Sequence, residues 1–123
     1  EILCRLKGRL YLIRGNHDER YLRDKDFDVS RFEWVRDYAE IHDNKRKIVL
    51  MHYPVFCYNG QFRRGADGTP LTYMLHGHIH SRGDRANARN RDRERPIFRY
   101  DVGLDANEYK PVSRDQILSF FGL

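Results

Sequence analysis

The sequence lacks several features that would place it in a particular class of protein. Its 123 residues include two cysteines, Cys4 and Cys57, and no Cys-x-x-Cys pair, which disfavours a zinc ribbon or a dithiol redox motif. Two isolated cysteines fit a reducing compartment, so we expect free thiols and a cytoplasmic protein. No apolar run approaches about 18 residues, and we therefore expect no membrane-spanning segment. The sequence has no initial Met, and Glu1 is expected to lie within a longer helix.

Charge and aromatic content indicate a folded, basic domain. The net charge is +5, and eight Tyr, seven Phe and one Trp argue against disorder. We see no internal repeat, and residues 1–123 are expected to form a single domain. A basic balance favours phosphate-bearing partners only weakly. The Arg-rich segment 82–95 is predicted to be a solvated, mobile loop.

Alternating apolar runs and turn residues predict a mixed α/β fold. A Ser-x-x-Glu pattern at Ser30 predicts a short helix, and a Ser-x-x-Gln pattern at Ser113 predicts a C-terminal helix. The loop 53–70, rich in Gly, Pro and Asn, is of the kind that often carries function. Residues 9–14 are predicted to form a buried strand. Residues 37–41 and 47–52 are predicted to form a hairpin, and two further strands are predicted at 71–75 and 97–102.

Polar side chains follow three of these strands. Asn16, His17 and Asp18 follow the first, His52 follows the second strand of the hairpin, and a histidine cluster follows residues 71–75. Strand ends are where α/β proteins build their sites. Imidazole is a common ligand for transition metals, an amide oxygen can also bind a cation, and a histidine oriented by a carboxylate can donate a proton.

The histidine cluster has a spacing of two residues. His76, His78 and His80 would point the same way if the strand continued through them. Gly77 would let an ion or another backbone segment approach closely. The spacing therefore predicts a metal site.

Three motifs in this order, "GNHD" at 15–18, "HYP" at 52–54 and "GHIH" at 77–80, resemble those of the calcineurin-like metallophosphoesterases. The longer segments "LKGRLYLIRGNHD", "KIVLMHYPV", "LHGHIHS" and "VGLDANEYKPVS" resemble the small, single-domain bacterial and phage members of that family. The resemblance covers nearly the whole chain. It implies a four-layer α/β/β/α sandwich and hydrolysis of a phosphomonoester or phosphodiester, with a nucleotide or nucleic acid among the candidate substrates.

The resemblance also implies roles for individual residues. Two divalent transition-metal ions (Mn, Fe, Ni or Zn) would lie at the strand ends. Asn16, His52 and His78 would hold one ion, and His80 would reach the other. His17 would stabilise the phosphate and protonate the leaving group, and Asp18 would orient His17. His76 would be a packing residue beside the site.

The chain departs from the family pattern in its first part. The family begins with Asp-x-His and Gly-Asp motifs, which supply the carboxylate that bridges the metals. This chain has no Asp-x-His motif. Its Gly83-Asp84 follows the last histidine and therefore cannot be the family's Gly-Asp motif. We therefore expect the C-terminal two-thirds of a domain, with impaired hydrolysis, at most one tightly bound metal and self-association through unpaired strands. Asp101 stands where the family pattern has Asn.

Two other functions remain open. The chain could be a non-catalytic module that binds phosphate or nucleic acid, or a structural zinc domain using His52, His78, His80 and Cys57. A closed zinc site has no use for Asn16 and a spare acid, which disfavours the zinc domain. Arg63 and Arg64 are candidates for gripping a substrate phosphate, with a solvated loop end as the alternative.

Overall fold

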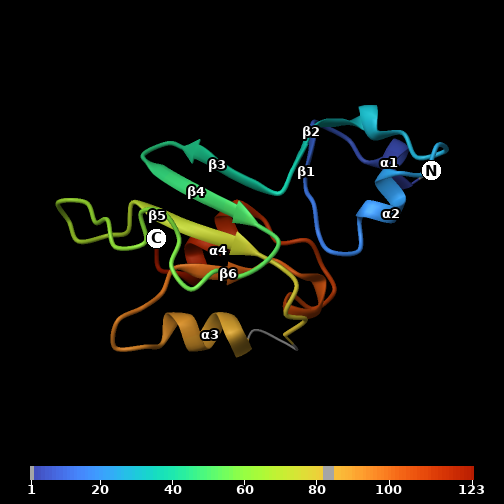
Figure 1. The fold of residues 1–123 in the computed structure, drawn as a ribbon. Coiled ribbons are helices and arrows are strands. Elements are labelled where there is room, and N and C mark those ends of the chain that lie inside the picture. Colours follow the sequence, from blue (N-terminus) through green and yellow to red (C-terminus); the bar gives the residue numbers. More distant parts are fainter. Residues whose placement is uncertain (1, 82–84) are drawn as a thin grey trace.

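The larger of two β-sheets contains four strands in the order β3-β4-β5-β6 (Figure 1). These strands are β3 (Tyr38–Asp43), β4 (Arg46–Met51), β5 (Thr72–His76) and β6 (Arg99–Asp101). The computed structural model describes residues 2–81 and 85–123 and has a mixed α/β fold with two sheets and four α-helices in those ranges. The β3–β4 pair is antiparallel, whereas β4–β5 and β5–β6 are parallel. The carboxyl ends of β4, β5 and β6 therefore meet at one edge of the sheet.

The predicted hairpin is confirmed. Residues 38–43 pair with 46–51, and Asn44 adopts a left-handed conformation in the turn between them (φ 55°). Asn tolerates this conformation better than most residues, which explains a tight turn at this position.

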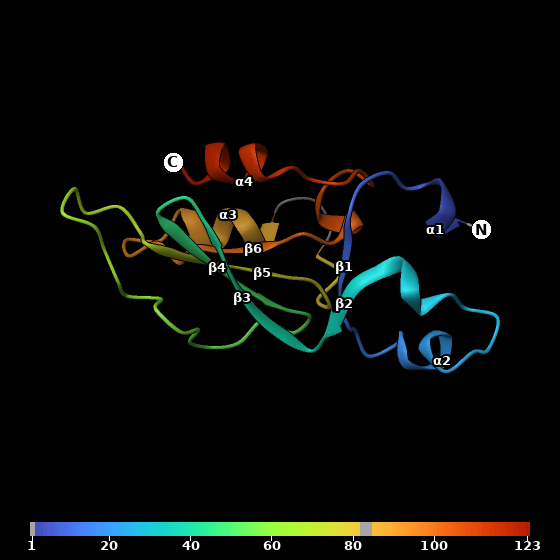
Figure 2. The same ribbon diagram turned by 90° about the horizontal axis from the view of Figure 1, so that it is seen from above.

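Alternate residues of the central strands pack against different layers. Ile48 and Tyr73 face the C-terminal helix α4 (Arg114–Phe120), and Val49 and Met74 lie in a second core cluster with Tyr58 from the long loop. Figure 2 shows α4 on one side of the sheet and the loop between β4 and β5 on the other. The predicted capping box of α4 is confirmed, since Ser113 and Gln116 exchange both hydrogen bonds.

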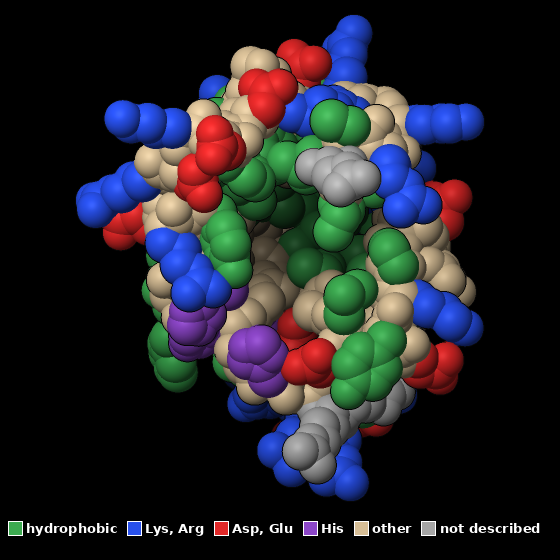
Figure 3. All heavy atoms as spheres, turned by 90° about the vertical axis from the view of Figure 1, so that its right-hand side faces the viewer, with side chains coloured by type: hydrophobic (Ala, Val, Ile, Leu, Met, Phe, Trp, Pro, Cys, Tyr) green, Lys and Arg blue, Asp and Glu red, His purple; other side chains and the backbone are tan. Residues whose placement is uncertain are grey.

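The N-terminal segment forms a smaller unit beside this sheet (Figure 1). Strand β1 (Leu10–Ile13) pairs in parallel with β2 (Phe32–Arg36), and the short helices α1 (Ile2–Arg5) and α2 (Glu19–Leu22) flank them. The expectation of a buried first strand is wrong. No residue of β1 is buried, because the strand pairs along one edge only and both core clusters draw their residues from positions 48–123. On this side of the molecule, apolar side chains line a hollow and histidines lie at its rim (Figure 3).

The helix predicted from Ser30 is also wrong. The structure has a single 3-10 turn at Val29–Arg31, followed directly by strand β2. The Asp28 carboxylate accepts hydrogen bonds from both the backbone N–H and the hydroxyl of Ser30, so Asp28 rather than Ser30 is the N-cap of this turn. The aromatic and β-branched residues that follow then pair with β1, where their strand preference is satisfied.

The Arg-rich segment contains a helix, α3 (Arg85–Arg91), rather than a loop throughout. Residues 82–84, which include Gly83-Asp84, lie outside the described residues. The Asn87 side chain is fully buried; it accepts from the Asp101 N–H (2.6 Å) and donates to the Asp101 carbonyl (3.2 Å). Asn90 donates to the Arg99 carbonyl (3.2 Å). Two amide side chains of helix α3 therefore attach it to the outer edge of β6.

Both cysteines are free thiols, as expected. Both cysteine side chains are exposed, although the neighbouring residues in "ILCRL" and "VFCYN" are largely apolar and predict packed segments. Among residues 2–81 and 85–123, no helix has the length and apolar character needed to cross a bilayer.

Candidate metal centre

Three side chains from three strand ends converge on one point. His52 Nε2 lies 2.7 Å from Asn16 Oδ1 and 3.2 Å from His78 Nδ1, and His78 Nδ1 lies 3.3 Å from Asn16 Oδ1. Asn16 follows β1, His52 follows β4 and His78 follows β5. The two sheets therefore meet at this triangle of polar atoms.

The backbone fixes the positions of these side chains. The Gly77 N–H donates to the His52 carbonyl (3.0 Å), which holds the segments after β4 and β5 together. The Gly15 N–H donates to Asp18 Oδ2 (2.6 Å) and closes the turn that presents Asn16. A Cβ at Gly15 would lie 3.0 Å from the His52 ring, closer than most Cβ contacts, so the ring would have to shift to make room for a side chain there.

The histidine cluster does not extend the strand. Strand β5 ends at His76, and His78 and His80 have positive φ values of 71° and 46°. Because the backbone turns here, the expectation that the three imidazoles share one face is wrong. Left-handed conformations at non-glycine residues are costly and often mark functional sites.

The buried side chains of His76 and Asp101 contact the backbone and side chains around this turn. His76 is 3% exposed, as expected of a packing residue, and its Nδ1 lies 3.0 Å from the Gly77 carbonyl. Burial lowers the pKa of His76 below its usual value. The Asp101 carboxylate is also buried and accepts from the Ser81 hydroxyl (2.6 Å) and the Gly103 N–H (2.9 Å). An Asn could occupy the Asp101 position with its amide donating to Ser81, so the departure from the family pattern is sterically conservative.

His80 lies apart from the triangle. Its Nδ1 is 2.8 Å from Asp105 Oδ2, a residue of the 3-10 turn η2 (Leu104–Ala106), and its side chain is 76% exposed. A carboxylate on one ring nitrogen holds the proton there and leaves Nε2 as the ligand or base. His80 is therefore available to solvent and oriented by Asp105.

The electrostatics of the triangle favour a neutral His52. Burial lowers the pKa of His52, the neighbouring His78 lowers it further, and the Asp18 carboxylate opposes both effects. A metal binds the unprotonated imidazole nitrogen, so a lowered pKa favours the binding form. All three members of the triangle are neutral ligands.

The triangle has the dimensions of a partial metal site. Ligand atoms about 2.1 Å from a cation and 90–110° apart lie about 3.0–3.4 Å from one another. Two of the three separations, 3.2 and 3.3 Å, fall in this range, and the third, 2.7 Å, is shorter. The residues therefore fit one divalent ion after a small outward shift of Asn16 or His52.

Other metal-binding groups are not seen in the described residues. No three side chains of His, Cys, Asp or Glu come together as a metal-binding group within the ranges 2–81 and 85–123. The triangle contains two imidazoles and is completed by an amide, which lies outside that set. The structure thus does not assemble His52, His78, His80 and Cys57 into the site that a zinc domain would need.

His17 and Asp18 lie beside the triangle. His17 is exposed, whereas the Asp18 carboxylate turns inward to the Gly15 N–H. The orientation of His17 by Asp18 stays a prediction. A pocket of about 380 Å³ adjoins Asn16 and His17, and its remaining lining residues are Glu19, Arg20 and Arg23.

Sequence reasoning missed Arg20 and Arg23. A signal was present, because the residues after "GNHD" read "ERYLR" and place two arginines at a spacing of three. Residues at that spacing share one side of a helical turn. Helix α2 is exposed, so its charged side chains were not distinguishable from an ordinary solvated helix.

Arg63 and Arg64 lie at the opposite edge of the sheet. The Leu71 N–H donates to the Arg63 carbonyl, and Leu71 precedes β5, whose far end carries His76. Five residues at about 3.3 Å each separate the two edges by about 16 Å. Arg64 donates to the Gln61 carbonyl (2.8 Å). The structure therefore does not bring either arginine to the triangle.

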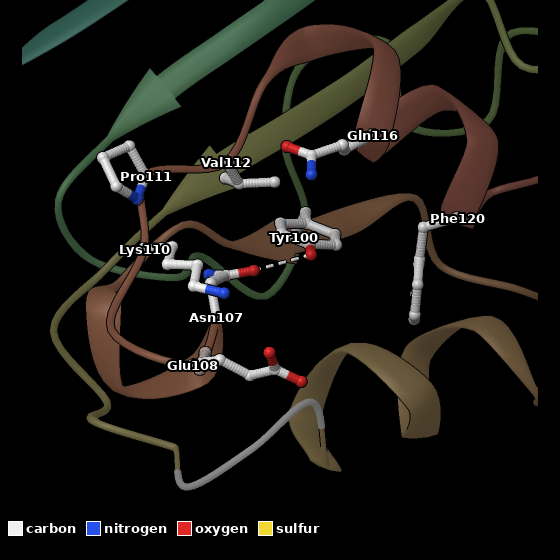
Figure 4. Close-up of a pocket in the computed structure, with 9 residues that line it drawn as sticks. Tyr100, Asn107, Glu108, Lys110, Pro111, Val112, Gln116 and Phe120 are labelled. Carbon is white, nitrogen blue, oxygen red and sulfur yellow. Dashed lines mark hydrogen bonds between the residues drawn. The ribbon is translucent and has the colours of Figure 1, made fainter.

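A larger pocket, of about 490 Å³, lies between α4, η2 and β6 (Figure 4). Its Tyr100 hydroxyl donates to Asn107 Oδ1 (2.7 Å). None of the residues that line it belongs to the triangle.

Comparison of the chain with models of protein families, with curated proteins and with solved structures finds no match.

Proposed function

We propose that this chain belongs to a calcineurin-like, metal-dependent phosphoesterase and that phosphoester hydrolysis takes place at the triangle of Asn16, His52 and His78. The observation that carries the proposal is the convergence of Asn16 Oδ1, His52 Nε2 and His78 Nδ1 to within 3.3 Å of one another. These residues come from three motifs separated by up to 62 positions in sequence. The four-layer sandwich is the corresponding proposal for the architecture of the complete domain.

The triangle would hold one divalent ion, and His80 would reach a second. Such ions polarise phosphoryl oxygens and lower the pKa of water. His80 presents Nε2 outward because Asp105 binds its Nδ1. A reducing, cytoplasmic setting suits the proposal, since both thiols are free.

The remaining roles belong to the protein's own side chains. His17 adjoins Asn16 in sequence and lines the same pocket, so a phosphate at the triangle would lie within its reach. A protonated imidazole there would offset charge on the phosphoryl oxygens and donate its proton to the leaving oxygen. Asp18 closes the turn that sets the position of both residues.

One observation favours a second candidate function, a phosphate-binding module without hydrolysis. An amide oxygen and two imidazole nitrogens supply no negative charge, so a bound cation would gain no charge compensation from these three ligands. Neutral ligands alone predict weak binding of a first ion and weaker binding of a second.

The experiment that separates the two functions combines a Mn²⁺ titration with hydrolysis of a chromogenic phosphodiester. We expect one Mn²⁺ per chain and slow, Mn²⁺-dependent hydrolysis, both lost in His52→Ala. Mn²⁺ binding without any hydrolysis would favour the binding module. Hydrolysis that is unaffected by His52→Ala would refute the assignment of the site.

A further inference from the structure

The pocket beside the triangle has a strongly polar lining. Asn16, His17, Glu19, Arg20 and Arg23 surround about 380 Å³. Asn16 is shared with the triangle, so a group bound at the triangle and a group bound in the pocket would be neighbours.

Two guanidinium groups provide the charge of the pocket. Arg20 and Arg23 are separated by three residues across helix α2 and its C-cap, so both lie on one side of the turn. Arg23 Nη2 contacts Glu19 Oε1 at 2.5 Å, and Arg20 Nη2 donates to the Tyr21 hydroxyl at 2.6 Å. One carboxylate balances one guanidinium, which leaves a net positive charge before His17 is counted.

The Glu19–Arg23 pair is open to exchange. The side chains are 56% and 78% exposed, and an ion pair in water at this exposure is weak. A phosphate can replace the Glu19 carboxylate because it presents the same geometry to the planar guanidinium fork and carries more charge.

We infer that this pocket binds a second phosphate group of the substrate, adjacent to the phosphoester at the triangle. The substrate class is therefore a phosphoester with a neighbouring phosphate, as in a nucleoside diphosphate or a single-stranded oligonucleotide. Arg20 and Arg23 bind this phosphate, and Glu19 competes with it for Arg23. The inference rests on the proposed function for the position of the first phosphate.

The test measures binding of pyrophosphate in the presence of EDTA, so that the result does not depend on metal. We expect pyrophosphate to bind more tightly than inorganic phosphate. The double variant Arg20→Gln/Arg23→Gln should weaken pyrophosphate binding at least about tenfold. Glu19→Gln should strengthen it about threefold, because the competing carboxylate is removed.

Matched variants control for total charge. Arg93→Gln/Arg95→Gln removes the same charge from exposed positions outside the pocket, and Glu33→Gln is the matched control for Glu19→Gln. Both should leave pyrophosphate binding within about twofold of the wild type. Equal losses in the two arginine double variants would overturn the inference, as would no loss in either.

NMR signals of the Arg20 and Arg23 side chains in the wild-type protein give a reading that needs no variant. They should shift on addition of pyrophosphate, and unchanged signals would contradict the inference. A nucleoside diphosphate and a short oligothymidylate, titrated separately, distinguish the two sources of the second phosphate. Pyrophosphate binding through these arginines in a protein that binds no Mn²⁺ would sink the proposed function and leave only a phosphate-binding pocket, whereas Mn²⁺-dependent hydrolysis without such binding would overturn this inference alone.

Discussion

At the scale of single residues, Gly15 leaves the space in which the His52 ring lies. A Cβ at Gly15 would lie 3.0 Å from two atoms of the His52 ring, closer than nearly all Cβ contacts, whereas a Cβ at Gly77 would lie 3.7 Å from the same ring. We predict that Gly15→Ala displaces His52 and weakens Mn²⁺ binding at least about tenfold, since misplaced ligands lose much of their affinity. Isothermal titration calorimetry with Mn²⁺ measures the change.

Gly77→Ala is the matched control, because it adds the same methyl group beside the same ring at an ordinary contact distance. It should change Mn²⁺ affinity by less than about threefold. Similar affinities for the two alanine variants would show that His52 is not confined by Gly15.

Adjacent residues of one motif should have separable roles. We predict that His78→Ala weakens Mn²⁺ binding, because its Nδ1 is one corner of the triangle, whereas His17→Ala leaves Mn²⁺ binding intact and slows hydrolysis. Elemental analysis after dialysis against Mn²⁺ compares the two variants, and a phosphodiester assay gives the rate. Equal metal loss in both variants would disprove this division of roles.

His52 and His78 follow β4 and β5, and because neighbouring parallel strands bring their carboxyl ends together, the proximity of these two residues could be predicted from the strand pattern. Asn16 follows β1, a strand of the other sheet, and its place in the triangle was implied only by the family resemblance. The backbone turn at His78 and His80 could not be predicted from the sequence. A two-residue spacing is compatible with a continuing strand, and only the tertiary contacts of Gly77 and Asp101 impose the left-handed conformations. Asp105 was missed for the same reason, since it reaches His80 across 25 residues.

At the scale of secondary-structure elements, helix α3 protects the edge strand β6. The Asn87 amide oxygen accepts from the Asp101 N–H on the side of β6 where no strand of residues 2–81 or 85–123 pairs, and unpaired strand edges favour aggregation. We predict that Asn87→Ala lowers the free energy of unfolding by about 1–3 kcal/mol, the cost of a buried polar group that loses its partner. Urea denaturation followed by circular dichroism measures it.

Arg89→Ala is the control on the same helix, because Arg89 is exposed and its neighbour Asn90 keeps its bond to Arg99. It should change the free energy of unfolding by less than about 0.5 kcal/mol. Comparable losses in both variants would mean that the helix stabilises the protein through general contacts rather than through its asparagines.

Glu40 joins the hairpin to the long loop and makes stability depend on pH. Its carboxylate contacts Lys47 Nζ at 2.5 Å and accepts from Asn59 Nδ2 at 2.9 Å, and these bonds, with Lys47 first, lower the pKa of Glu40 from 4.5 to about 2. The folded state therefore binds the proton more weakly than the unfolded state. The stabilisation is fully present above pH 4.5 and disappears as the pH falls toward 2.

We predict that Glu40→Gln lowers the urea midpoint at pH 7 and that the difference from the wild type narrows steadily below pH 4.5. Urea melts at several pH values between 7 and 3 would show the convergence. Glu33→Gln, at an exposed position of β2, should give no comparable trend. A difference that is constant across this range would rule out the Glu40 contacts as its cause.

Local sequence patterns predicted an element well where its hydrogen-bond partners are close in sequence. The hairpin of β3 and β4 and the capping box at Ser113 are short-range hydrogen-bonding arrangements, and both were predicted. The Ser30 helix and the Arg-rich loop were wrong because a distant partner decides each outcome. Strand β1 draws residues 32–36 into a sheet, and strand β6 provides the surface on which α3 forms.

At the scale of the whole molecule, the site joins two units of unequal stability. Both hydrophobic clusters belong to residues 48–123, whereas no residue of α1, β1, α2 or β2 is buried. Regions with few buried apolar contacts open at a lower free energy than the core. The β1–β2 unit should therefore open without unfolding of the four-stranded sheet, and opening removes Asn16 from the triangle.

This arrangement couples metal binding to the order of the N-terminal unit. We predict that amide hydrogens of β1 and β2 exchange faster than those of β4 and β5 in the metal-free protein, and that Mn²⁺ slows the exchange of β1 and β2. A ligand that binds only the closed state stabilises it by about 2.7 kcal/mol at 100 times its dissociation constant, which corresponds to about hundredfold slower exchange. Hydrogen exchange followed by NMR resolves the two units. In His78→Ala the effect of Mn²⁺ should vanish while the metal-free pattern is retained, because the substitution removes a ligand without altering the pairing of β1 with β2. Equal protection of both sheets in the metal-free protein, or a Mn²⁺ effect that survives in His78→Ala, would show that the triangle does not hold the two units together.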